Sequence, residues 1–217
     1  NLNGKKRRRD MGGNDKILEW AMKIQGIAQS GLAYCKNEYD IERYLQLRDI
    51  AAEMLAERTD IPMTKIKDVF CGETGYQTPK LDTRAAIFNE DKILLVREKS
   101  GMWALPGGWC DVDMSVSENT VKEVREEAGL CVTAERIIAV QDWRKRNACN
   151  YIFGIIKIFV LCKSHGGEFV PNTETTESAY FGRDEIPKEL ATNKTTKEQI
   201  LMCFEANEND SAKVIFD

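Results

Sequence analysis

The 217-residue sequence has little of what several classes of protein require. Its one histidine, His165, lies in the turn-forming sequence Ser-His-Gly-Gly, so a histidine-dependent catalytic triad is not expected. The seven cysteines are odd in number and include no Cys-x-x-Cys pair, which argues against a disulfide framework and a zinc site. No apolar run has membrane-spanning length and no secretory signal is recognisable, so we expect a cytoplasmic protein without a membrane partner.

Charge is unevenly distributed along the chain. Residues 1–10 hold five cations and one carboxylate, a net charge of +4, which leaves −8 on the rest because the formal total is −4. The acidic body argues against a broad nucleic-acid-binding surface. Residues 1–13 form a basic leader. Either its first ten residues precede a native start at Met11, or the leader is a genuine tail that binds nucleic acid.

Apolar periodicity divides the remaining residues into four parts. A helical domain is expected over residues 14–71, with a second helix N-capped by Asp40. A linker rich in glycine follows over residues 72–80. An α/β domain is expected over residues 81–207 and a C-terminal tail over residues 208–217. The N-terminal helices have wide apolar faces, which favour packing against another domain or subunit.

The α/β part contains several apolar runs and two helices. Its main helix is predicted to begin at Ser115, where Ser-x-x-Glu fits a capping box, and to end at Gly129 as a left-handed cap. A closing helix is expected over residues 195–207, and a turn at Gly166-Gly167. Strands are expected over residues 83–88, 92–97, 132–143, 151–163 and 178–181. Strands with helices on both faces predict an α/β sandwich with a mixed sheet.

Three carboxylates are the most informative feature of the main helix. Glu123, Glu126 and Glu127 stand at i, i+3 and i+4, so they share one helix face. Like charges this close repel each other, but a divalent cation turns the repulsion into a binding site. Hard oxygen ligands favour Mg²⁺ or Mn²⁺. A solvated acidic face is the alternative, although it does not explain the flanking Gly108 and Gly129.

The stretch from Gly108 to Leu130 resembles the Nudix box, G-x5-E-x7-R-E-U-x-E-E-x-G-U, where U is a bulky aliphatic residue. Two positions depart from the pattern, because Met114 replaces its first Glu and Lys122 replaces its Arg. The residues that match it at the correct spacing are Gly108, Glu123, Val124, Glu126, Glu127, Gly129 and Leu130.

The resemblance extends over almost the whole chain after Met11. Residues 25–34, 39–44, 79–84 and 102–109 are similar to the Nudix subgroup that carries an extra N-terminal helical domain. The implied fold is an α/β/α sandwich with a mixed sheet, preceded by that small domain. Members of the subgroup hydrolyse CDP-choline and ADP-ribose, and they often form dimers. The resemblance therefore implies a small nucleotide-derived substrate and a homodimer.

The resemblance also implies roles for individual residues. Glu123, Glu126 and Glu127, together with Gly108, are expected to hold Mg²⁺ or Mn²⁺, so that metal-activated water splits a pyrophosphate bond. The candidate bases are Glu174, Glu177 and Glu123, and the alternative for the first two is a pair of solvated loop acids. Contacts to substrate are expected from Arg84, Arg97, Gly107, Gly108 and Trp109. Further candidates are Lys99, Arg144, Trp103, Trp143 and Tyr180. Surface charge is the alternative for all the basic candidates, Arg84 and Arg97 included, and core packing is the alternative for all the aromatic ones, Trp109 included.

The two departures leave a second function open. In the family, the missing Glu and Arg support the loop and the helix, and Lys122 lacks the planar fork that grips a carboxylate with two bonds. Asp113 or Glu118 are candidates to replace the Glu. The leading hypothesis is a hydrolase of nucleoside diphosphates linked to another moiety. The alternative is a catalytically impaired protein that binds nucleotides as a regulator. The thiol of Cys110 is either reactive or packed in the loop.

Overall fold

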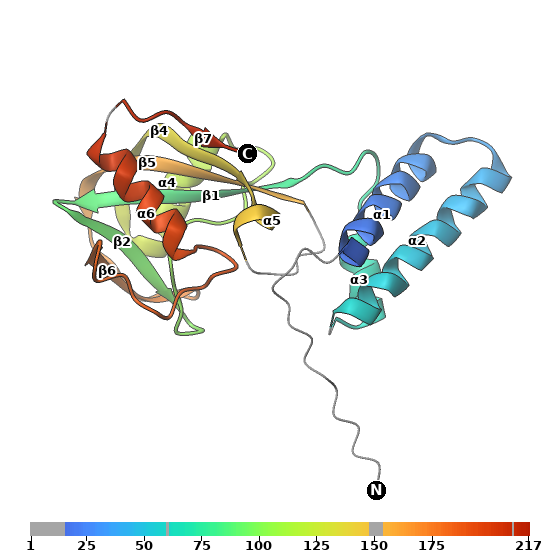
Figure 1. Ribbon diagram of the computed structural model, residues 1–217, viewed down its shortest axis with the longest axis horizontal. Helices are drawn as coiled ribbons and strands as arrows, with labels where there is room; N and C mark the ends of the chain where they lie inside the picture. Colours follow the sequence, from blue (N-terminus) through green and yellow to red (C-terminus); the bar gives the residue numbers. More distant parts are fainter. Residues whose placement is uncertain (1–15, 60, 148–153, 210) are drawn as a thin grey trace, which may run out of the picture. The chain divides into compact units, whose positions relative to one another are not determined.

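The computed structural model describes residues 16–59, 61–147, 154–209 and 211–217, so the basic leader lies outside the described residues. The chain divides into two compact units, with the boundary between Thr78 and Pro79 (Figure 1). No helix in the described part is both long and apolar enough to cross a bilayer.

The first unit consists of three helices: α1 Lys16–Tyr34, α2 Glu38–Arg58 and α3 Met63–Phe70. The prediction that Asp40 caps α2 is wrong. Asn37 is the N-cap, and its side chain accepts hydrogen bonds from the backbone of Tyr39 and Asp40. Asp40 instead lies in the first turn, where the helix dipole favours a carboxylate.

Helices α1 and α2 pack closely because small residues lie between them. A β-carbon on Gly31 would lie 2.4 Å from the ring of Tyr44, so only glycine allows this approach. Apolar residues from all three helices form one core, as the helical periodicity predicts: Leu18, Ala21, Ala51, Ala52, Leu55, Ile66 and Phe70.

The second unit is built on a seven-stranded sheet of order β3-β2-β1-β5-β4-β7, with β6 paired to β2. The pairs β1–β5 and β4–β7 are parallel and the others are antiparallel, so the sheet is mixed. The strands are β1 Lys80–Asn89, β2 Lys92–Glu98, β3 Trp103–Ala104, β4 Leu130–Asp142, β5 Ile155–Gly167, β6 Thr175–Gly182 and β7 Ile215–Phe216.

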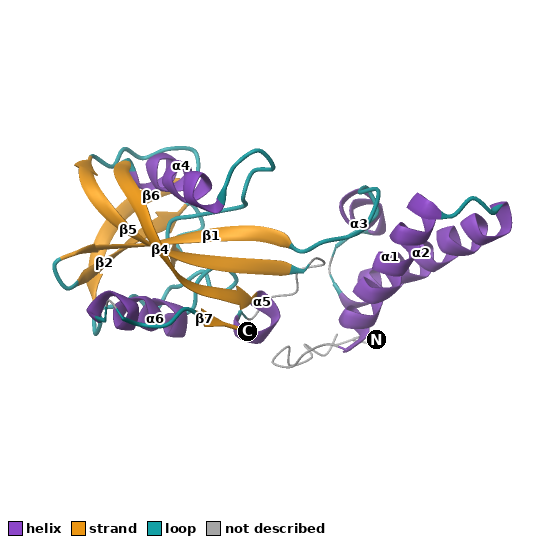
Figure 2. Cartoon of the chain, turned by 90° about the horizontal axis from the view of Figure 1, so that it is seen from above, coloured by secondary structure: helices purple, strands orange, loops and turns teal. Residues whose placement is uncertain are grey.

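Helices cover both faces of this sheet. Helix α4 (Val116–Ala128) lies over one face and α6 (Lys197–Glu208) over the other (Figure 2). Successive side chains of a strand point to opposite faces, so the strands supply both cores alternately. Thus Ala85 and Ile87 pack on the α4 side, whereas Ala86 packs on the α6 side. The predicted α/β/α sandwich with a mixed sheet is confirmed.

Two expected boundaries differ in the structure. The turn predicted at Gly166-Gly167 is wrong, because both glycines continue β5 with positive φ angles of 103° and 134°. Gly167 still pairs with Leu130 of β4. Trp143 does not end a strand but begins the one-turn helix α5 (Trp143–Arg146), which Asp142 caps by accepting from the backbone of Arg144.

Three other strands differ from the prediction or extend beyond what can be compared. Strand β6 begins at Thr175 rather than Ser178, since Asn172 and Thr175 anchor this turn to one another. The expected start of β5 at Tyr151 lies outside the described residues. The expected tail contains β7, which adds to the edge of β4 in parallel register.

A buried charge network joins β1 to β5. Asp82 and Lys157 lie opposite each other in the parallel register. The carboxylate of Asp82 accepts two hydrogen bonds of 2.7 Å from Arg84, and its Oδ1 lies 3.5 Å from the ammonium of Lys157. Burial opposes ionisation of Asp82, but the two cations hold the pKa of this carboxyl below its ordinary value.

The same cations hold two loops against the sheet. Arg84 donates to the carbonyl of Leu105 at 3.2 Å, and Lys157 donates to the carbonyl of Lys194 at 2.9 Å. The network therefore fixes segments that are far apart in the sequence, and it makes each of the three side chains dependent on the other two.

We predict that Asp82→Asn lowers the free energy of unfolding by about 3–5 kcal/mol at pH 7, because two buried cations lose their counter-charge. The folded-state pKa of Asp82 lies below its unfolded value of about 3.9, so its ionisation stabilises the fold above that pH. The difference from wild type should shrink as the pH falls through the folded-state pKa. Urea unfolding between pH 7 and pH 3 measures it, with the exposed Asp184→Asn as control. Equal stability of both variants would contradict the assignment.

Candidate active site

Helix α4 carries the three carboxylates of the predicted motif. Its predicted ends are confirmed: Ser115 and Glu118 form the capping box, and Gly129 is a left-handed C-cap with φ 68°. Glu123 and Glu127 are buried, with 9% and 6% of their surfaces exposed, whereas the Glu126 side chain is 60% exposed. The first and last carboxylates of the motif therefore face the interior and the middle one faces solvent.

The segment from Pro106 to Cys110 lies along β1 like an extra strand. Ala85 donates to the carbonyl of Pro106, Thr83 to that of Gly108, and Cys110 to that of Leu81, each at 2.9 Å. Gly107 has φ 142°, and a β-carbon there would lie 1.9 Å from the carbonyl oxygen of Thr83. Only glycine fits so close to the strand, and this places the loop beside α4.

The two buried carboxylates lie close to the glycine backbone. The N–H of Gly107 donates to Oε2 of Glu127 at 2.7 Å. Burial raises the pKa of Glu127 to about 7, although this N–H and the charge of Arg84 oppose the change. A β-carbon on Gly108 would lie 2.6 Å from Oε2 of Glu123. Burial also raises the pKa of Glu123, against the effect of the Lys122 ammonium.

The expected metal ligands do not converge on one point. Among the described residues, no three Asp, Glu, His or Cys side chains are grouped closely enough to hold a metal ion. The ammonium of Lys122 lies 3.2 Å from Glu123 and 3.8 Å from Glu126, between the two carboxylates. A cation that bound both would compete with this ammonium.

Lys122 also holds the loop that precedes α4. Its ammonium lies 2.8 Å from Oδ2 of Asp111. This contact joins loop and helix, the task that the resemblance gives to the missing Glu and Arg. The candidate replacements do not take that place: Glu118 is used in the capping box, and Asp113 is exposed. This role of Asp111, which lies three residues before the position of the first Glu of the box, was not anticipated from the sequence.

Asn119 of α4 is a second residue that sequence reasoning missed. It is fully buried, and its side-chain oxygen accepts from the backbone of Asp111 at 3.2 Å. Its amide donates to the hydroxyl of Thr83 at 2.8 Å, so it joins loop, helix and strand. The thiol of Cys110 faces the carbonyls of Asp111 and Met114. Burial and the Asp111 carboxylate raise the pKa of this thiol, which favours packing over reactivity.

The two arginines expected to contact substrate have other partners. Arg84 is 2% exposed and is held by Asp82 and Leu105, so its donors do not face solvent. The expectation that Arg84 contacts phosphate is therefore corrected to a buried structural role. Arg97 is half-exposed and lies 3.3 Å from Glu177, its cross-strand neighbour.

The loop that carries Glu174 is attached to the end of α4. Asn172 donates to the carbonyl of Glu126, and Thr175 donates to that of Glu127, each at 2.8 Å. Glu174 is exposed on this loop. The structure thus brings the Glu174 loop to the carboxylate helix, whereas Glu177 is paired with Arg97.

The aromatic candidates differ in exposure. Trp103 and Trp143 are buried, and Trp103 packs edge-on against Phe181 with ring centroids 4.9 Å apart. Tyr180 is half-buried beside the core on the α4 side. These three are core residues. Trp109 is 44% exposed in the loop beside Gly108 and is accessible to a ligand.

The two other basic candidates make no contact that indicates a ligand. Lys99 is attached to the Glu174 loop through its backbone, which donates to the carbonyl of Glu174 at 3.2 Å. Arg144 forms an ion pair with Asp142, the cap of α5.

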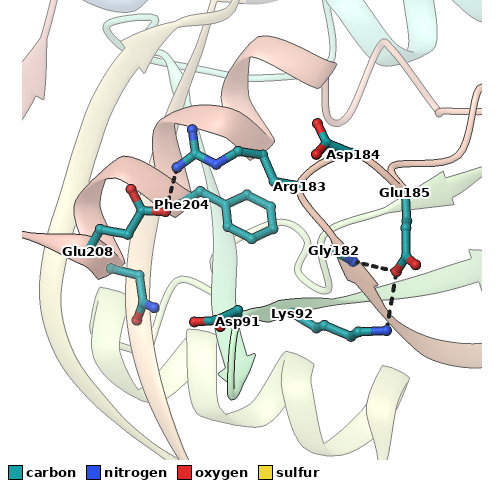
Figure 3. Close-up of a pocket in the computed structure, with 9 residues that line it drawn as sticks. Asp91, Lys92, Gly182, Arg183, Asp184, Glu185, Phe204 and Glu208 are labelled. Atoms are coloured by element: carbon teal, nitrogen blue, oxygen red, sulfur yellow. Dashed lines mark hydrogen bonds and ion pairs between the residues drawn. The ribbon is translucent and has the colours of Figure 1, made fainter.

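A separate cavity of about 400 Å³ lies at the end of α6 that contains Glu208 (Figure 3). Its cations are paired within the cavity: Arg183 lies 2.7 Å from Glu208, and Lys92 lies 3.2 Å from Glu185. The Arg183 guanidinium also lies over the ring of Phe204. The lining includes no residue of the box, so we do not assign the reaction to this cavity.

Comparisons with known proteins agree with this geometry. Residues 78–202 match the family model of the NUDIX domain, and residues 15–70 match a model described as a UDP-X-like, N-terminal oligomerisation domain. The chain is 41% identical over 203 residues to YjhB of Bacillus subtilis (strain 168), a protein with the provisional name ADP-ribose pyrophosphatase. That match covers 93% of this chain and 97% of YjhB.

Two solved structures are similar over large parts of the chain. An ADP-ribose pyrophosphatase from Streptococcus suis 89-1591 is 54% identical with a TM-score of 0.61, covering 64% of this chain and all of that one. A UDP-X diphosphatase is 31% identical with a TM-score of 0.61, covering 92% of this chain and 98% of that one. The matched domain, its carboxylate helix and the full-length relative together show that the chain belongs to the Nudix family of hydrolases.

Proposed function

We propose that the protein hydrolyses the pyrophosphate bond of a small nucleoside diphosphate derivative in the presence of Mg²⁺ or Mn²⁺. ADP-ribose and CDP-choline are the favoured substrates. The observation that carries the proposal is the burial of Glu123 and Glu127 against the backbone of Gly107-Gly108. The names of YjhB and of the Streptococcus suis protein support ADP-ribose as the first substrate to test.

The carboxylates fit a divalent cation by their chemistry. Burial raises the pKa of both Glu123 and Glu127, so the protein alone does not compensate their negative charge. Their oxygens are hard ligands, and Glu126 adds a third carboxylate at the surface. The ion would supply charge neutralisation and activation of water. Gly108 has no β-carbon to overlap the carboxylate of Glu123, and the N–H of Gly107 donates to one oxygen of Glu127.

The remaining roles fall to residues around the helix. Trp109 is the accessible aromatic residue and is proposed to stack on the nucleobase. Glu174, Glu177 and Glu123 are the proposed candidates for the general base, although Glu177 lies 3.3 Å from Arg97 and Glu123 lies 3.2 Å from Lys122. The position of Glu174 supports its candidacy, because its loop is attached to the C-terminal end of α4.

A nucleotide-binding regulator is the less favoured function. It was motivated by Met114 and Lys122, which depart from the box. The contact of Lys122 with Asp111 joins the loop to the helix, so the departures do not remove that support. No observation in the described residues specifically favours the regulator.

We further propose that the protein forms a homodimer through α1. The matched N-terminal model is described as an oligomerisation domain. Trp20, Ile27 and Tyr34 recur every seven residues, which places them on one helix face, and they are 53%, 61% and 71% exposed. An exposed apolar stripe of this kind marks a protein–protein interface.

We expect Glu127→Gln to lower kcat for ADP-ribose by about 100-fold or more, because it removes a carboxylate from the proposed metal site. Glu205→Gln changes an exposed glutamate of α6 and should leave the rate unchanged. Release of AMP, followed by chromatography, measures both. Full turnover in the Glu127 variant would refute the assignment.

Restoring the family residues should have little effect. We predict that the double variant Met114→Glu, Lys122→Arg changes kcat/KM by less than about tenfold, because Asp111 and Lys122 already join loop and helix. Steady-state kinetics with ADP-ribose test this. A gain of about 100-fold or more would show that the natural sequence is catalytically impaired.

One charged substitution tests the proposed dimer interface. Ile27→Glu places a carboxylate in the exposed stripe of α1 and should yield monomers in light scattering after size exclusion, since its charge would be desolvated in the interface. Val170→Glu alters another exposed apolar residue, in the α/β unit, and should leave the dimer intact. A dimeric Ile27 variant would exclude this face.

A further inference from the structure

The loop between β6 and α6 and the carboxylate helix α4 both bind the segment of residues 103–107. Trp103 donates to the carbonyl of Glu189 at 2.7 Å and accepts from Ala191 at 2.9 Å. The backbone N–H of Leu105 donates to the hydroxyl of Thr195 at 3.2 Å. Two residues later, Gly107 donates to Glu127. Trp103 and Leu105 therefore bind this loop, and Gly107 binds α4.

Lys194 is the cation that this loop brings to the site. Its ammonium lies 2.6 Å from Oε1 of Glu98, at the end of β2, and its side chain is 33% exposed. Its carbonyl accepts from the buried ammonium of Lys157 at 2.9 Å, so the backbone at this position is anchored to the sheet. The position is fixed while the side-chain tip remains open to solvent.

Each cation around the carboxylates has an acidic partner, and Lys194 has Glu98. Arg84 is buried and binds Asp82, Arg97 is paired with Glu177, and the ammonium of Lys122 lies between Asp111 and Glu123. Lys194 and Arg84 both contribute positive charge at Glu127. Of these two, Lys194 is the one that solvent reaches.

We propose that the ammonium of Lys194 binds the pyrophosphate group of the substrate, and that Glu98 is a positioning residue that holds this ammonium beside the site. The inference rests on the proposed function. A pyrophosphate needs positive charge nearby, and the buried Arg84 does not offer it. Lysine serves as a mobile point charge for phosphate. An ion pair that is partly open to solvent is weak, so Lys194 can leave Glu98 for the ligand.

Two substitutions separate this role from simple pairing with Glu98. Lys194→Met should raise KM for ADP-ribose by about tenfold or more, with a smaller change in kcat, because a charged hydrogen bond to substrate is lost. Glu98→Gln keeps the cation and should raise KM by less than about threefold. Lys194→Arg should restore most of the affinity. Lys197→Met changes an exposed lysine three residues away and should match wild type.

Binding without turnover gives an independent readout. Calorimetric titration with the non-hydrolysable α,β-methylene analogue of ADP-ribose, in Mg²⁺, should show about tenfold weaker binding to Lys194→Met than to wild type. If the wild type hydrolyses ADP-ribose or CDP-choline but the Lys194 variant binds the analogue normally, this inference alone fails. If Lys194→Met and Glu98→Gln lose affinity equally and unfold at the same lowered temperature, Lys194 acts only as a partner of Glu98 and the inference is overturned. If the wild type neither hydrolyses ADP-ribose or CDP-choline nor binds the analogue, both the proposed function and this inference fail.

Discussion

The close approach of a glycine backbone to two buried carboxylates is the contact on which the rest of the site depends. Gly107 and Gly108 lie against both β1 and α4, and a side chain at either position would overlap a carbonyl or a carboxylate. Glu127 and Glu123 are thereby removed from water at a cost that raises their pKa values. A positive charge beside these two carboxylates would offset that cost.

The sheet beneath the carboxylates carries buried positive charges. Arg84 is buried under the carboxylates, and its charge is balanced by Asp82, which also binds Lys157 across the parallel strands. Arg84 therefore contributes potential to Glu127 without being free to contact a ligand. The same two cations anchor the carbonyls of Leu105 and Lys194, so the floor of the site and the loops around it form one hydrogen-bonded structure.

Local rules in the sequence were enough to predict the two ends of the central helix. Ser115 and Gly129 act through contacts within a few residues, and the alternation of the strands separates the two cores. Local rules failed where two signals compete, as with Asn37 and Asp40, or where glycines continue a strand, as in Gly166-Gly167.

The contacts that join distant parts of the chain were not predictable from one sequence. Asn119 joins Asp111 to Thr83, and Lys194 lies about 70 residues after the helix that it approaches. The burial of Arg84 depends on Asp82 and on a lysine in another strand, so an arginine expected to face phosphate became part of the core. No spacing rule encodes such pairs, because each depends on the completed sheet.

The measurement that tests the account most directly is hydrolysis of ADP-ribose by the wild-type protein with Mg²⁺, with and without EDTA. Products are identified by ³¹P NMR. The account predicts that AMP and ribose 5-phosphate form in equal amounts, that EDTA abolishes the reaction, and that excess Mg²⁺ restores it. Turnover that persists in EDTA would contradict the role of the α4 carboxylates. Binding of ADP-ribose without turnover of it, or of CDP-choline, would indicate a regulator rather than an enzyme.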